Sequence, residues 1–101
     1  MEITPLRLKG TFLLAPSPIR DERGYFMRYW DRGLAESHGL TVAWVQENES
    51  FNYKRGTLRG LHFQNPPHAE TKLVRVSRGA VLDVFVDLRK GSETYGEWDS
   101  V

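Results

Sequence analysis

Short segments in which apolar and polar residues alternate run along the whole chain, separated by glycine and proline. The alternation is clearest over residues 72–78 and 80–88, where every second side chain would lie on the same face of an extended strand. In the later segment Asp83, Phe85 and Asp87 share one face, and valines and leucines occupy the other. Short strands at a spacing of roughly 8–12 residues, with Gly/Pro turns between them, predict an all-β sandwich or barrel.

The beginning of the chain predicts further strands. Residues 3–14 read as one or two strands broken at Lys9 and Gly10. The polar segment 21–24 is typical of a turn, and it leads into an aromatic run at 25–30 that favours a strand.

One short helix is expected over residues 32–38, because Gly39 supplies a stop directly after it. Two further strand-like segments, 42–46 and 57–64, lie on either side of a polar loop over residues 47–56.

Composition indicates a single globular domain. The chain has 101 residues, of which 40% are hydrophobic and 27% are charged, and a chain of this length forms one domain at most. Lys and Arg number 14 against 13 Asp and Glu, giving a net charge of +1. That balance argues against a nucleic-acid module that works through bulk positive charge.

The sequence also bears on compartment. An apolar run of about 18 residues, which a membrane span needs, is absent, and the first 20 residues do not follow the pattern of a signal peptide. The sequence contains no cysteine, which excludes disulfides, thiolate zinc sites and thiol nucleophiles. We therefore expect a cytoplasmic protein that binds neither membrane nor nucleic acid.

Three polar residues placed within strand patterns are candidates for chemistry. His62 suits proton transfer near neutral pH, Lys72 could stabilise a developing oxyanion, and Asp83 interrupts an apolar strand. If their strands share a face that lines a cavity, we expect the three groups to converge. The alternative is that a lone histidine in a strand is a structural or surface residue, and that Asp83 is tied to a neighbouring arginine or backbone amide.

A metal site is not expected. His62, His68 and Glu70 are conceivable ligands, but Gln64 stands where a compact His-x-His pair would need its second histidine. His68 follows two prolines in a loop that offers nothing to fix its geometry.

Two arginines next to glycines, Arg23 and Arg59, are candidates for a phosphate clamp. The planar guanidinium matches phosphate oxygens, although a solvated surface arginine is the commoner case. Arg59 and His62 have opposite parity along an extended strand, so a bulge or twist near Gly60 is required if both face one ligand.

Five ordered blocks carry a resemblance to a known family. They are DERGYF at 21–26, QENES at 46–50, GTLRGLHFQ at 56–64, KLVRV at 72–76 and DVFVDLRKGS at 83–92. The chain resembles the dTDP-4-dehydrorhamnose 3,5-epimerase family from about residue 3 to residue 98. The resemblance implies a cupin-like β jelly roll, of which residues 1–101 would be the N-terminal part of a single domain.

The resemblance also implies roles for individual residues. His62 would be the general base that removes protons next to the 4-keto group of the sugar, and Lys72 would stabilise the enolate oxygen. Ligand contacts are implied for Arg59, near the pyrophosphate, and for Arg23, Gln46 and Asn48. The implied partner is a dTDP-linked 4-keto-6-deoxy sugar, with no metal or organic cofactor, and the implied assembly is a homodimer.

Departures from the family pattern set limits. The family domain continues beyond Val101 into further strands, which carry a tyrosine proton donor and the aspartate partner of the histidine. An isolated chain of this length is therefore expected to form an incomplete jelly roll and to be catalytically incomplete. Arg28 replaces a usual glutamate; it would either add a positive charge at the mouth of the site or pair with Glu22. The loop 49–56 is one residue longer than usual.

Two alternatives to the epimerase hypothesis therefore stay open. One is a non-catalytic module that binds nucleotide sugars or supports assembly. The other is a related epimerase that acts at one carbon only.

Overall fold

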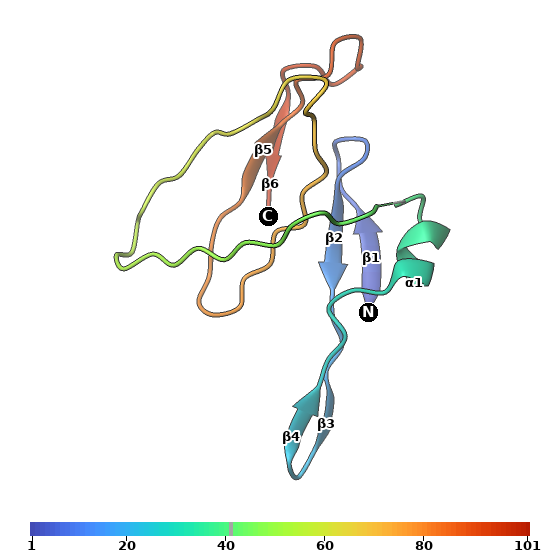
Figure 1. Ribbon diagram of the computed structural model, residues 1–101, viewed down its shortest axis with the longest axis vertical. Coiled ribbons are helices and arrows are strands. Elements are labelled where there is room, and N and C mark those ends of the chain that lie inside the picture. Colours follow the sequence, from blue (N-terminus) through green and yellow to red (C-terminus); the bar gives the residue numbers. More distant parts are fainter. Residues whose placement is uncertain (41) are drawn as a thin grey trace. The chain divides into compact units, whose positions relative to one another are not determined.

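The computed structural model describes residues 1–40 and 42–101 (Figure 1). Backbone contacts divide the chain into a first unit, Met1–Thr41 with Ala80–Val101, and a second unit, Val42–Gly79. The elements are β1 (Glu2–Pro5), β2 (Phe12–Ala15), β3 (Ile19–Asp21), β4 (Gly24–Phe26), α1 (Arg32–Ser37), β5 (Val84–Val86) and β6 (Trp98–Ser100). The strands pair as three antiparallel two-stranded sheets, β1-β2, β3-β4 and β5-β6. No helix in the described ranges is long and apolar enough to cross a membrane.

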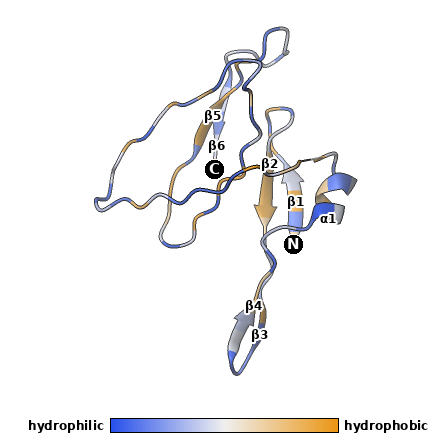
Figure 2. Ribbon diagram, viewed as in Figure 1, coloured by the Kyte–Doolittle hydropathy of each residue, from blue (hydrophilic) through white to orange (hydrophobic). Residues whose placement is uncertain are grey.

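The hairpin of β1 and β2 confirms the predicted break at Lys9 and Gly10. Ile3 pairs with Leu14 in the ladder, and Gly10 has a positive φ of 86°, a conformation that glycine adopts without steric cost. Ile3 and Leu8 are buried at 7% and 2% exposure and form part of the small core. Figure 2 shows β2 as a predominantly apolar strand.

The hairpin of β3 and β4 confirms the predicted turn at residues 21–24. Asp21 Oδ1 accepts a hydrogen bond from the Arg23 backbone N–H at 2.9 Å, and Ile19 pairs with Phe26. The predicted strand at 25–30 ends at Phe26. The next position on the opposing strand would be Pro18, which has no N–H to donate to the ladder.

Helix α1 confirms the predicted helix at residues 32–38. Asp31 is its N-cap, and its Oδ1 accepts the Leu34 N–H at 3.0 Å. The Arg28 guanidinium donates to the other carboxylate oxygen at 2.7 Å. The Leu34 amide first, and then Arg28, lower the pKa of Asp31 from its ordinary value. Asp31 therefore joins the start of the helix to the segment that follows β4.

Replacing Asp31 with alanine should increase amide hydrogen exchange in α1 by up to about tenfold, because the helix loses its cap. Asp31→Asn is the matched control: asparagine caps almost as well as aspartate but cannot form the ion pair with Arg28. Hydrogen exchange followed by NMR measures both variants. Equal protection of α1 in the wild type and in Asp31→Ala would show that the cap contributes nothing.

Strand β5 forms the centre of the strand predicted at residues 80–88, and it pairs with β6. Their ladder continues past both ends of β5: Asp83 and Val101 exchange two backbone hydrogen bonds of 3.0 Å, and the Asp87 N–H donates to the Glu97 carbonyl at 2.9 Å. The face shared by Asp83, Phe85 and Asp87 is the more covered one, and Asp87 is only 5% exposed.

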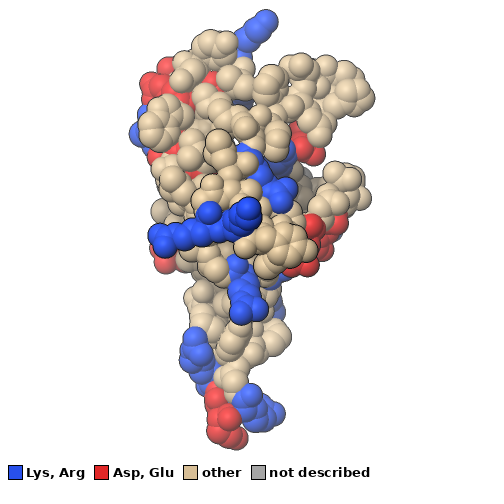
Figure 3. Space-filling model, turned by 90° about the vertical axis from the view of Figure 1, so that its left-hand side faces the viewer, with Lys and Arg blue, Asp and Glu red and all other residues tan. Residues whose placement is uncertain are grey.

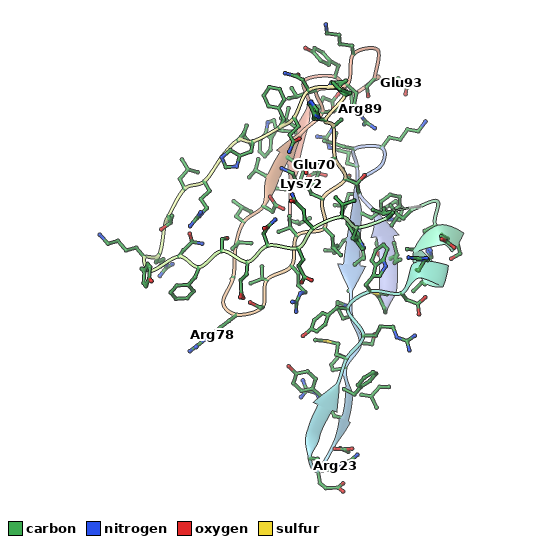
Figure 4. The ribbon with its side chains drawn as sticks, in the orientation of Figure 1. Arg23, Glu70, Lys72, Arg78, Arg89 and Glu93 are labelled. Atoms are coloured by element: carbon green, nitrogen blue, oxygen red, sulfur yellow. The ribbon has the colours of Figure 1, made fainter. Side chains whose placement is uncertain are left out.

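Asp87 organises the loop that joins β5 to β6. Its carboxylate accepts hydrogen bonds from the Arg89 backbone and guanidinium at 2.8–2.9 Å and from the hydroxyls of Ser92 and Thr94 at 2.6 and 2.7 Å. These bonds, with Arg89 the largest contributor, hold the pKa of Asp87 far below its usual range. Arg89 is labelled on this loop in Figure 4.

Replacing Asp87 with asparagine should lower the midpoint of thermal unfolding at neutral pH by about 5–10 °C, because the amide cannot satisfy all of these donors. Since the folded-state pKa is depressed, the carboxylate stabilises the fold above its ordinary pKa of 3.8 and loses that effect as the pH falls below it. The difference between wild type and variant should therefore shrink in acid. Asp99→Asn, on the opposing strand, is the control; a difference that persists undiminished at about pH 2 would contradict the assignment.

The second unit contains no strand among its described residues, although the sequence predicts strands at 42–46, 57–64 and 72–78. A strand exists only where its backbone groups pair with a neighbouring strand. In this unit the His68 N–H donates to the nearby Asn65 carbonyl at 2.9 Å, which closes a local turn. Apolar side chains here remain open to solvent, including Val45 at 93% and Leu58 at 91% exposure.

Candidate functional site

The seven residues predicted to form the site are divided between the two units. Arg23, in the β3-β4 turn, and Asp83, next to β5, belong to the first unit. The second unit contains the other five, all exposed: Gln46, Asn48, Arg59, His62 and Lys72. No hydrogen bond or ion pair joins any two of the seven within the described residues. The shared cavity therefore stays a prediction.

His62 follows a distinct backbone feature. Gly60 has a φ of 100°, so the chain leaves the extended conformation where the sequence predicts a bulge or twist. A Cβ at position 60 would lie 3.5 Å from the His62 backbone nitrogen and 3.9 Å from its ring Nδ1. The imidazole is solvent-exposed, and in the part of the chain that the structure describes it has no hydrogen-bond partner. It can therefore exchange a proton with an incoming ligand.

Lys72 has a carboxylate partner that sequence reasoning missed. Its Nζ lies 3.1 Å from Glu70 Oε1, and the two side chains are 50% and 32% exposed. Figure 4 shows the two residues side by side. The spacing of Glu70 and Lys72 indicates this pair, because residues two apart lie on the same face of an extended segment. The ion pair fixes the position of the ammonium while offsetting part of its charge.

The two candidate phosphate-binding arginines have different partners. Arg23 donates through Nε and Nη2 to Asp21 Oδ2 at 3.2 and 2.6 Å, and the Arg23 side chain is the main reason that the pKa of Asp21 is lowered. Arg59 instead donates through Nε to Asn52 Oδ1 at 2.7 Å and through Nη2 to the Phe51 carbonyl at 3.4 Å. Arg23 is thus paired with a carboxylate at an exposed position, whereas Arg59 is hydrogen-bonded to neutral groups.

The carboxylate that pairs with a neighbouring arginine is that of Asp87, and not that of Asp83 as the structural alternative expects. The Asp83 side chain is half-buried and accepts no hydrogen bond from a described residue, while its backbone pairs with Val101. Asp87 is the carboxylate tied to a neighbouring arginine. Asp83 therefore has a carboxylate available for a further interaction.

Arg28 pairs with Asp31 at 2.7 Å, so the expected alternative of a pair with Glu22 is wrong. A cavity of about 260 Å³ in the first unit adjoins this pair. Its lining residues are Met1, Ser17, Ile19, Phe26, Arg28, Asp31 and Leu34.

Charges of both signs are interspersed over the face drawn in Figure 3, in keeping with the net charge of +1. Among residues 1–40 and 42–101, no three His, Cys, Asp or Glu side chains form a cluster that could hold a metal ion. The expectation that no metal is needed stays an expectation.

Comparison with known proteins places these residues in a family context. The family model described as dTDP-4-dehydrorhamnose 3,5-epimerase matches residues 5–101. An enzyme of that name from Methanothermobacter thermautotrophicus is 51% identical over 94 residues, which cover 93% of this chain and 50% of the relative. A dTDP-4-dehydrorhamnose 3-epimerase from Streptomyces niveus is 42% identical, over 98% of this chain and 48% of the relative.

A solved structure shares the fold. The crystal structure of dTDP-4-dehydrorhamnose 3,5-epimerase from Bacillus anthracis, with TDP and PPi bound, matches with a TM-score of 0.94 and 40% identity. The match covers 99% of this chain and 57% of that one. It confirms the predicted all-β, cupin-like jelly-roll class for the part of the fold that this chain spans, about half the length of the curated relatives. The chain belongs to the dTDP-4-dehydrorhamnose 3,5-epimerase family.

Proposed function

We propose that the protein takes part in epimerisation of a dTDP-linked 4-keto-6-deoxy sugar. The observation that carries the proposal is the family match over residues 5–101, which includes every residue assigned to the site. His62 acts as general base, Lys72 stabilises the enolate, and Asp83 contributes a carboxylate to the same site. No metal or organic cofactor takes part, and the reaction occurs in the cytoplasm.

These groups account for the first half of the reaction, the removal of a proton next to the ketone. A proton on C3 or C5 lies next to the 4-keto carbonyl, so its removal by His62 sends the bonding electrons toward the carbonyl oxygen. That oxygen becomes an enolate, which the Lys72 ammonium stabilises as its negative charge develops. Inversion of the carbon then needs a second acid that returns a proton to the opposite face, and none of the residues assigned here has that role.

Ligand binding rests on four polar residues. Arg59 and Arg23 bind the diphosphate through charge-assisted hydrogen bonds, and Gln46 and Asn48 bind polar groups of the ligand. The TDP and PPi bound to the Bacillus anthracis epimerase support a diphosphate as the common feature of the ligand.

A second candidate is a one-carbon epimerase, which the 42% identity to the 3-epimerase from Streptomyces niveus keeps open. A third is a module that binds nucleotide sugars without catalysis. Incubation with the 4-keto sugar in deuterated water separates the three: deuterium enters at both C3 and C5, at one of them, or at neither.

We expect the protein to be a homodimer at micromolar concentration. Among residues 1–40 and 42–101, each of the three sheets has only two strands and leaves unpaired edges. Isolated two-stranded sheets are marginally stable in water. Exposed edges and apolar side chains such as Val45 and Leu58 favour pairing with a second copy. Light scattering measures the mass; a monodisperse monomer would contradict this prediction.

A further inference from the structure

We propose that Asn52 is the positioning residue for Arg59, holding its guanidinium in the orientation that binds the diphosphate. The inference rests on the proposed function, because it assigns to Asn52 the support of a residue that the proposal places against the ligand. Asn52 itself makes no contact with the phosphates in this account.

One edge of the Arg59 guanidinium is fixed by a hydrogen bond to Asn52. Arg59 Nε donates to Asn52 Oδ1 at 2.7 Å, within the normal range, while the contact from Nη2 to the Phe51 carbonyl is long at 3.4 Å. Arginine presents five N–H donors in a fixed fork. With Nε directed at Asn52, the two Nη1 donors and one of the Nη2 donors remain for an anion.

The polar loop 47–56 brings Asn52 to Arg59, seven residues later in the chain. The Thr57 hydroxyl donates to the Lys54 carbonyl at 2.8 Å, and Gly56 has a φ of 78°, so the chain turns between the two residues. The rings of Phe51 and Tyr53, on either side of Asn52, pack edge to face with centroids 5.1 Å apart. These contacts restrain the backbone from which Asn52 projects.

Asn52 is uncharged, and this affects how strongly Arg59 can bind an anionic ligand. An amide oxygen orients the guanidinium without adding a negative charge beside it, whereas the Asp21 carboxylate competes with a phosphate for Arg23. Within the described residues no carboxylate lies at ion-pair distance from Arg59. Arg59 therefore keeps its full positive charge for the diphosphate, and an aspartate at position 52 would compete directly with the phosphates.

The test is calorimetry with dTDP and with inorganic pyrophosphate on four proteins: wild type, Asn52→Ala, Asn52→Asp and the control Asn65→Asp. We expect Asn52→Ala to weaken both affinities about three- to tenfold, and Asn52→Asp about ten- to a hundredfold. Asn65→Asp adds the same charge to the same unit and should bind as the wild type does. A merely structural role would weaken Asn52→Ala and Asn52→Asp alike.

A double-mutant cycle identifies the residue through which Asn52 acts. In an Arg59→Ala background, Asn52→Ala should cause no further loss of affinity, because the group that Asn52 positions is gone. Arg59→Ala with unchanged affinity overturns the proposed phosphate role of Arg59, and with it the inference. If Arg59→Ala loses affinity while both Asn52 variants bind like the wild type, the inference alone is wrong. Failure of the wild type to bind either ligand overturns both.

Discussion

Replacing His62 with asparagine should slow the exchange of the sugar C3 and C5 protons with deuterated solvent by about 10²- to 10⁴-fold. This is the usual contribution of a positioned general base. Asparagine keeps a polar side chain but has no basic nitrogen, so it removes proton transfer while causing little change at an exposed position.

His68→Asn is the matched control, because His68 is exposed in the same unit but lies in the turn after Asn65. It should exchange at the wild-type rate. NMR of the recovered sugar measures both variants. Wild-type exchange by His62→Asn would eliminate His62 as the base, and equal losses in the two variants would point to a general effect on folding.

Replacing Lys72 with methionine should slow the same exchange by about 10²- to 10³-fold, the cost of removing one group that stabilises a developing oxyanion. Methionine preserves most of the length and the apolar stem of lysine without its charge. The variant also frees Glu70, whose carboxylate lies 3.1 Å from the ammonium in the wild type. Glu70 would then place an uncompensated negative charge near the enolate, and this charge would slow the exchange further.

Lys54→Met is the control for Lys72, since Lys54 is an exposed lysine of the second unit. We expect it to leave exchange and dTDP affinity unchanged. If Lys72→Met loses dTDP affinity but keeps its exchange rate once saturated, Lys72 binds the ligand and does not stabilise the enolate.

Elements with local partners were predictable from the sequence. The break at Gly10, the turn at 21–24 and the helix starting at Arg32 depend on nearby residues alone, and all three are present. The strand expected at 57–64 is absent because a strand also needs a neighbour, and periodicity cannot supply one. Likewise β4 ends at Phe26, short of the predicted end at residue 30, because the next residue on the opposing strand is Pro18.

The candidate site was predictable in its residue types but not in its pairings. Motifs pointed to His62, Lys72 and Arg59, whose grouping into one cavity stays a prediction. The partners Glu70 and Asn52 were not found, because a side-chain contact depends on the exact path of a loop. Asp87 carried a recognisable signal, an aspartate followed by Arg89, Ser92 and Thr94, which sequence reasoning did not interpret.

We infer that this chain supplies the base and the enolate-stabilising cation of a nucleotide-sugar epimerase. The most direct measurement is the incorporation of solvent deuterium into a dTDP-linked 4-keto-6-deoxy sugar, followed by NMR, because exchange asks only for proton removal and a stabilised enolate. The wild type should incorporate deuterium at C3 and C5, and His62→Asn should incorporate almost none. No incorporation by a wild-type protein that binds the sugar would contradict this inference.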